Sequence, residues 1–158
     1  MYDLVIKNGK IIDGSGAQPY VADVAVKNGK IEKIGSVTEC AKQIIDASGL
    51  TVTPGFIDSH SHADYSFFTL SAMKEKTEQG ITTAIAGQCG DSAAPLSVNY
   101  DKSNRQMLGD HGNTYDICKT MESFLDYGSR VPLGCNIAMF VGHGSIRSSV
   151  MGMENRAP

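Results

Sequence analysis

The chain has 158 residues, of which 41% are hydrophobic, and a formal net charge of -3 at pH 7. This small negative charge argues against a protein that binds nucleic acid or an anionic membrane surface mainly by electrostatics. The N-terminus, from Met1 to Lys7, is charged and lacks the apolar segment of a signal peptide, and no later apolar run approaches the length of a membrane span. We therefore expect an ordinary globular protein of the cytoplasm.

The cysteines argue against a disulfide framework. Their spacings are irregular and no two form a CxxC pair, whereas disulfide-stabilised domains are small, rich in cysteine and secreted. Most of the four thiols are expected to be buried. They are Cys40, Cys89, Cys118 and Cys135.

The first part of the chain, residues 1–53, is predicted to be a β module. The string Lys-Asn-Gly-Lys-Ile occurs at residues 7–11 and again at residues 27–31. An Asn-Gly pair tolerates positive φ at both central positions of a tight turn, so each copy predicts a hairpin between short antiparallel strands. Residues 43–49 predict one more strand and a turn.

After about residue 50 the pattern changes to alternating strands and helices, which is typical of parallel βα units. Between the second strand and the second helix, residues 91–119 are rich in Ser, Asn, Asp and Gly and predict a long loop. The predicted elements are a strand at 52–58, a helix at 70–79, a strand at 81–86, a helix at 121–127 and a strand at 136–141.

Two histidines follow the first of these strands. His60 and His62 are one residue apart, so in extended backbone their imidazoles project to the same side while Ser61 faces away. Two imidazoles in this arrangement are suited to holding a divalent metal ion. An isolated His-x-His pair is more often a surface coincidence, but here a strand precedes it and Asp58 and Asp64 place carboxylates nearby.

The other two predicted strands also end at metal-ligating residue types. Cys89 follows the second strand, with Gly87 and Gly90 close on either side, and His143 follows the third strand, between Gly142 and Gly144. The carboxyl ends of parallel strands meet at one edge of a sheet, where α/β proteins bind their ligands. Cys89 is a metal ligand or a buried structural thiol. His143 is a metal ligand, a substrate-binding residue or a residue that orients another ligand.

These motifs resemble a known family. The stretch from Asp46–Gly49 through Pro54–His62 is similar to the signature of the amidohydrolase superfamily. Gly87–Pro95 and Val141–Arg147 resemble the N-acyl-D-amino-acid deacylase, or D-aminoacylase, branch. Gln88 departs from this branch, which commonly has Asn there.

The resemblance implies a fold and a metal site. The fold would be α/β, with a small β-sandwich portion at 1–53 and the first three or so βα units of a TIM barrel at 54–158. His60 and His62 would match the metal histidines of the first strand, and Cys89 the metal-binding cysteine. The site would hold one or two divalent ions, and the soft thiolate ligand favours Zn²⁺. The metal would activate water to hydrolyse the amide bond of an N-acyl-D-amino acid.

The resemblance also implies that the site is incomplete. The family's two further metal histidines and its general-base aspartate would lie beyond the C-terminus, so no catalytic residue is expected here. His143 and Arg147 are candidates for binding the small-molecule substrate. The Arg147 guanidinium would bind the carboxylate of the substrate. The residues after 54 suffice for only about three βα units of roughly 30 residues each, so the chain is expected not to close a barrel.

Two hypotheses follow for the function. In the first, the chain is the N-terminal part of a zinc amidohydrolase, inactive alone and active only with a complementing C-terminal polypeptide. In the second, it is a non-catalytic remnant that binds a metal or a partner. A hydrolase of cyclic amides, like dihydroorotase or hydantoinase, is a third alternative within the superfamily.

Overall fold

The computed structural model describes residues 1–68, 71–96 and 114–157. The chain divides into two compact units, Met1–Pro54 and Gly55–Pro158, which are described separately. The longest helix in the described ranges has nine residues, and none of the described helices could span a membrane.

The first unit is a five-stranded sheet with the long strand β1 at its centre. β1 pairs with β2 on one side in antiparallel fashion, and with β4 and β5 on the other side in parallel. Val5, Ala25 and Val37 form its buried core. The strands are β1 (Tyr2–Ile11), β2 (Tyr20–Lys27), β3 (Lys30–Gly35), β4 (Ala41–Asp46) and β5 (Thr51–Val52).

Only one of the two predicted Asn-Gly hairpins is present. Asn28 and Gly29 have φ of 51° and 73° and form the turn between β2 and β3. The prediction at Asn8 was wrong, because β1 continues through it and the backbone irregularity is a bulge against β2. Asn8 also has a positive φ, 60°. The Asn-Gly pair thus correctly indicated a left-handed backbone conformation at this position, but the chain does not reverse direction there. The parallel partners of β1 correct the expectation of an all-antiparallel module.

The bulge in β1 is held by a carboxylate on β2. Asp23 accepts hydrogen bonds from the backbone N–H of Asn8 at 2.9 Å, from Lys7 Nζ at 2.9 Å and from the backbone N–H of Val37 at 3.0 Å. These donors lower the pKa of Asp23 to about 2, with the Asn8 hydrogen bond as the largest cause. Asp23 thus links β1, β2 and the segment after β3.

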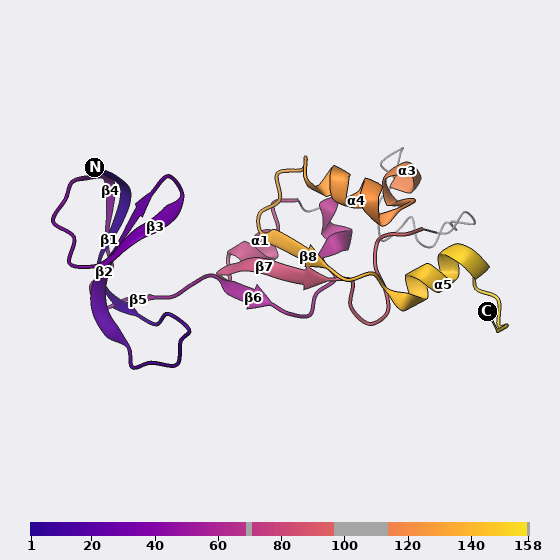
Figure 1. The fold of residues 1–158 in the computed structure, drawn as a ribbon, viewed down its shortest axis with the longest axis horizontal. Helices are drawn as coiled ribbons and strands as arrows, with labels where there is room; N and C mark the ends of the chain where they lie inside the picture. Colours follow the sequence, from indigo (N-terminus) through magenta and orange to yellow (C-terminus); the bar gives the residue numbers. More distant parts are fainter. Residues whose placement is uncertain (69–70, 97–113, 158) are drawn as a thin grey trace. The chain divides into compact units, whose positions relative to one another are not determined.

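The second unit contains three parallel strands in the order β6-β7-β8. Their arrows run in the same direction in Figure 1. They are β6 (Phe56–Asp58), β7 (Ile81–Ala86) and β8 (Asn136–Met139). The expected fold class, a β portion followed by the first βα units of a barrel, is therefore confirmed.

The predicted strand at 52–58 is wrong as one element. Its first residue, Val52, belongs to β5 in the first sheet, and Phe56–Asp58 form β6 in the second. Pro54 lies between them and has no backbone N–H to donate to a ladder, so the strand is interrupted where the two units meet in sequence.

The helices that connect the strands also differ from their predictions. The predicted helix at 70–79 is reduced to α1 (Lys74–Thr77), because Met73 has a left-handed φ of 45° and is fully buried; residues 69–70 lie outside the described ranges. Part of the predicted loop at 91–119 is helical, as α3 (Thr114–Cys118), while residues 97–113 are not described. The remaining helices are η1 (Ala63–Phe67), α4 (Met121–Gly128) and α5 (His143–Met151).

The core of the second unit contains buried residues of β7, η1, α3 and α4, and Figure 1 shows α3 and α4 on the same side of the sheet. Phe124 of α4 stacks on Phe67 of η1 with ring centroids 4.7 Å apart. Ala84 of β7 is fully buried beneath them. This packing fixes the β6–η1 connection, which carries the two histidines.

Replacing Asp23 with Asn is expected to lower the free energy of unfolding of the first unit by about 1–3 kcal/mol at pH 7, because a neutral amide replaces a charged acceptor of three hydrogen bonds. The pKa of Asp23 is lower in the folded state, so its contribution is present above pH 3.8 and is lost as the pH falls towards 2. Urea unfolding at pH 7, 4 and 3 measures both effects. Glu32→Gln, at an exposed carboxylate of β3, is the control; an equal loss there would contradict the assignment.

Candidate metal centre

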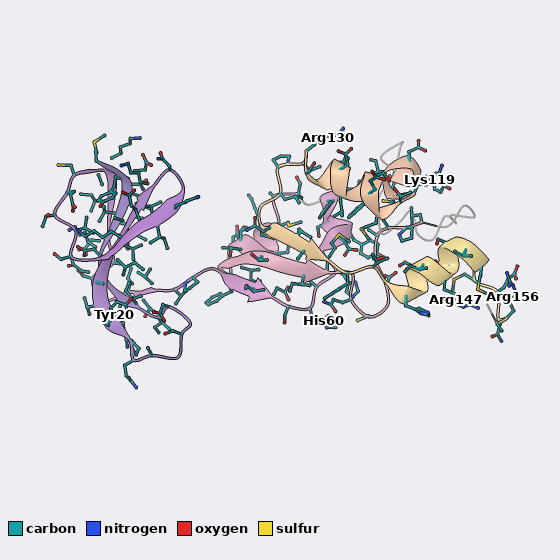
Figure 2. All side chains as sticks on the ribbon, in the orientation of Figure 1. Tyr20, His60, Lys119, Arg130, Arg147 and Arg156 are labelled. Carbon is teal, nitrogen blue, oxygen red and sulfur yellow. The ribbon has the colours of Figure 1, made fainter. Side chains whose placement is uncertain are left out.

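Three ligand side chains converge at the carboxyl ends of two neighbouring strands. His60 and His62 follow β6, and Cys89 follows β7. One ligand atom from each lies within 4.8 Å of the other two, and His60 Nε2 is 3.1 Å from Cys89 Sγ. All three side chains are exposed, and Figure 2 shows His60 in the connection beyond the tip of β6.

Cys89 sits in a tight turn of uncommon backbone conformation. The N–H of Asp91 donates to the carbonyl of Gln88 at 2.8 Å, which makes Cys89 and Gly90 the central residues of the turn. Their φ angles are 58° and 78°. A positive φ at both central positions is the combination that a type I′ turn requires, and it is costly for a residue with a side chain.

Two hydrogen bonds join the histidine segment to the β7 strand and its turn. The Gln88 side chain donates from Nε2 to the carbonyl of Ser59 at 3.1 Å, and the N–H of Ser61 donates to the carbonyl of Ile85 at 2.9 Å. Gln88, the residue that departs from the deacylase pattern, therefore has a structural contact of its own. These bonds hold the backbone on either side of His60 next to the Cys89 turn.

The two aspartates near the histidines do not join the ligand group. Asp58 forms an ion pair with Lys76 of α1 at 2.7 Å, and this hydrogen bond lowers its pKa. Asp64 is fully buried, and its Oδ2 accepts the N–H of Ala93 at 2.7 Å. Burial raises the pKa of Asp64. Both carboxylates thus have structural partners.

His143 and Arg147 lie on α5, the helix that follows β8, where Figure 2 shows Arg147. His143 is exposed and is not part of the group formed by the other three ligands. The Arg147 guanidinium donates to the backbone carbonyls of Glu154 and Arg156, both at 2.8 Å. These contacts place Arg147 against the chain's last described residues.

The start of α5 is packed directly on the Cys89 turn. The N–H of Gly144 donates to the carbonyl of Gly90 at 2.7 Å. A Cβ at Gly142 would lie 2.6 Å from the carbonyl oxygen of Gly90 and from the N–H nitrogen of Asp91, so only glycine fits. The glycines around His143 therefore serve close backbone approach to the neighbouring strand end.

A cavity among the described residues of the second unit lies elsewhere. It has a volume of about 650 Å³ and is lined in part by Thr82 at the start of β7 and by Asn136 at the start of β8. These are the amino ends of the strands, whereas the ligand group is at the carboxyl ends. The ligand group and this cavity are separate features.

Known proteins share sequence and fold with this chain. Residues 43–117 match the model of the family described as "Amidohydrolase family". The chain is 37% identical to a D-aminoacylase of Alcaligenes xylosoxydans xylosoxydans over 99% of its own length and 32% of the relative. Its structure matches that of an N-acyl-D-glutamate deacylase of Bordetella bronchiseptica with a TM-score of 0.86 and 35% identity, over 99% of this chain and 33% of that one. The predicted resemblance to the amidohydrolase family is confirmed. The chain spans about a third of the length of these relatives.

The deacylase branch is a better match than the hydantoinases. The L-hydantoinase of Arthrobacter aurescens is 25% identical and gives a TM-score of 0.57, over 94% of this chain and 30% of that one. This value is well below that of the Bordetella deacylase, although both alignments cover nearly the whole chain. The solved deacylase is complexed with zinc and a phosphonate inhibitor that mimics a tetrahedral reaction intermediate.

The donor set of this amidohydrolase-like chain fits zinc. Ligand atoms around one tetrahedral zinc lie roughly 3.3–3.7 Å apart, given bonds of about 2.0–2.3 Å. The three donor atoms are within 4.8 Å of one another, so modest side-chain rotations bring them to those distances. One thiolate and two imidazoles favour zinc over magnesium or calcium, which prefer oxygen ligands.

The sequence patterns did not reveal the residues that support the Cys89 turn. Tyr65 Oη donates to Asp91 Oδ2 at 2.7 Å, and the Ser145 hydroxyl lies 3.3 Å from Asp91 Oδ1. These residues come from the segments after β6, β7 and β8 respectively. Asp91 and Ser145 lie within the family motifs at 87–95 and 141–147, but nothing in the local sequence indicates their contacts with one another or with Tyr65.

Cys89→Ala is expected to weaken Co²⁺ binding by more than the roughly 10–100-fold typical of residues that only support a metal ligand. It should also remove the thiolate-to-cobalt absorption band, because Cys89 supplies the thiol of the ligand group and Cys40, the other exposed cysteine, is not part of that group. Titration of the purified chain with Co²⁺, followed by absorption spectroscopy, measures both. Cys40→Ala is the matched control and should leave both unchanged; a band that persists in Cys89→Ala would contradict the site.

Proposed function

We propose that this chain is part of a zinc-dependent amidohydrolase that cleaves the amide bond of N-acyl-D-amino acids, with His60, His62 and Cys89 as metal ligands. The observation that carries the proposal is the convergence of two imidazoles and one thiol from consecutive parallel strand ends. The deacylase-like fold around them supports the same substrate class.

Within this proposal the chain's own residues bind and place the metal. A bound zinc ion supplies Lewis-acid polarisation of an amide carbonyl and makes water a stronger acid. Gln88 and Ser61 hold the two ligand-bearing segments together through their hydrogen bonds to Ser59 and Ile85. Among the described residues, no carboxylate joins the three ligands, so we assign the general base to the part of a full-length enzyme that these residues do not cover.

We assign substrate contacts to His143 and Arg147. His143 begins α5 directly beside the Cys89 turn, since its neighbour Gly144 donates to Gly90. Arg147 lies one helical turn further along the same helix. A guanidinium suits recognition of the substrate's carboxylate, but here Arg147 donates to two backbone carbonyls, so a substrate carboxylate would have to replace them.

The second unit leaves apolar surface at both edges of its sheet. Phe56 and Ile57 of β6 are 56% and 64% exposed, and Phe140, directly after β8, is 59% exposed. Apolar side chains on unpaired edge strands are typical of surfaces that another polypeptide covers. We therefore assign residues 54–158 to the start of a barrel, residues 1–53 to a β-sandwich portion, and the missing barrel strands to a complementing C-terminal polypeptide.

The deacylase assignment is tested with a chimera in which residues 1–158 replace the corresponding third of D-aminoacylase. We expect the chimera to hydrolyse N-acetyl-D-amino acids in preference to the L enantiomers, and the isolated chain to show no turnover. In the chimera, Cys89→Ala should abolish turnover and Cys40→Ala should leave it unchanged. Robust turnover by the isolated chain would show that no complementing segment is needed, and turnover of hydantoins alone would favour the cyclic-amide alternative.

A chimera that folds and binds Co²⁺ but hydrolyses neither substrate class would favour a non-catalytic, metal-binding module. Circular dichroism and thermal unfolding establish that the chimera is folded. A folded chimera that neither binds Co²⁺ nor shows activity would instead contradict the metal centre itself.

The exposed edge of β6 should make the isolated chain self-associate. Ile57→Lys is expected to reduce this association, because a charge on the edge strand is costly to bury against another chain. Size-exclusion chromatography with light scattering, over a range of concentrations, measures the effect. Val150→Lys, at a position of α5 that is 78% exposed, is the control; equal effects of the two variants would contradict a specific role for the edge.

A further inference from the structure

The conformation of Cys89 requires support from its surroundings. Its φ of 58° belongs to the left-handed region, which is unfavourable for a residue with a side chain. Such a conformation persists only where neighbouring contacts hold it. The same conformation brings Cys89 Sγ to within 3.1 Å of His60 Nε2, so whatever holds the turn also sets the ligand geometry.

The backbone of the turn is bonded on both sides. The Asp91 N–H closes the turn on the Gln88 carbonyl at 2.8 Å, and the Gly90 carbonyl accepts the Gly144 N–H at 2.7 Å. These bonds fix the turn only while Asp91 and the start of α5 stay in place. The contacts of the Asp91 side chain therefore bear on the stability of the turn.

The Asp91 carboxylate lies between two other strand-end segments. Its Oδ2 accepts the Tyr65 hydroxyl of η1 at 2.7 Å, a short bond to a charged acceptor. Its Oδ1 is 3.3 Å from the Ser145 hydroxyl of α5, which also lies 3.0 Å from the Ser92 carbonyl and accepts the Ser92 N–H at 2.8 Å. The Tyr65 bond is thus the dominant one, and Ser145 ties the next residue, Ser92, to α5.

We propose that Asp91 is a positioning residue for the Cys89 ligand: its carboxylate, bonded to Tyr65, holds the left-handed turn that presents the thiol to His60. The expected effect on metal affinity rests on the proposed function, whereas the effect of Asp91 on the conformation of the turn does not. It gives Tyr65 and Asp91 a role in metal affinity although neither is a ligand. We call these two residues the Tyr65–Asp91 clamp.

The test compares Tyr65→Phe and Asp91→Asn with the unchanged chain, after removal of metal by a chelator. Amide hydrogen exchange by NMR follows the Asp91 and Gly144 amides, whose acceptors are the turn carbonyls. Loss of one such hydrogen bond is expected to speed their exchange roughly three- to tenfold. Tyr127→Phe on α4 and Asp126→Asn, whose partner is the exposed Arg130, are the matched controls and should leave these amides unchanged.

The second measurement is Co²⁺ binding by the same variants. Tyr65→Phe and Asp91→Asn are expected to lower the affinity roughly tenfold while the thiolate-to-cobalt band is retained, because the ligand is still present but less well placed. The double variant should lose no more affinity than the larger of the two single losses, because both changes break the same bond.

Wild-type exchange rates at both amides in both variants would overturn the proposal. So would faster exchange spread evenly over the second unit, because that result indicates general destabilisation. If the unchanged chain binds no Co²⁺, the proposed metal centre fails, and hydrogen exchange still decides whether the clamp holds the turn.

Discussion

The parallel pairing of β6 with β7 is the constraint on which the candidate site depends. Asp58 at the end of β6 lies opposite Ala84, two residues before the end of β7. The segments that follow β6 and β7 therefore leave the sheet at the same edge. The Ser61 N–H continues the contact between them by donating to the carbonyl of Ile85. With this register, a histidine two residues past one strand and a cysteine three residues past the other meet at 3.1 Å. A one-residue slip would turn the side chains to the opposite face.

The sequence was sufficient to predict the strands β7 and β8, because a β-branched or apolar run of this length favours a buried strand, and it also predicted the helix α4. It was also sufficient to predict that His60, His62 and Cys89 belong at one edge, since that follows from strand order. The hairpin at Asn8 failed for a physical reason. Its positive φ is used for a bulge, and the partner that holds the bulge is Asp23, fifteen residues away in sequence.

The supporting contacts of the site escaped prediction for the same reason. Asp58 and Asp64 lie beside the histidines in sequence, yet one is bonded to Lys76 and the other to the N–H of Ala93. Asp91 was part of the family motif, but its partner Tyr65 lies in the preceding βα segment. Side-chain pairing across loops depends on distances of a few tenths of an ångström, which residue spacing does not define.

The placement of these carboxylates determines the chemistry that the site is suited to. Each of the three aspartates is bonded to a structural donor, so the converging ligands are two imidazoles and a thiol rather than a group of oxygens. Oxygen-rich clusters select magnesium or calcium, whereas nitrogen and sulfur ligands select zinc. The carboxylates that keep the strand-end segments in place thus also leave the ligand set soft, and this donor set suits zinc better than an ion that prefers oxygen ligands.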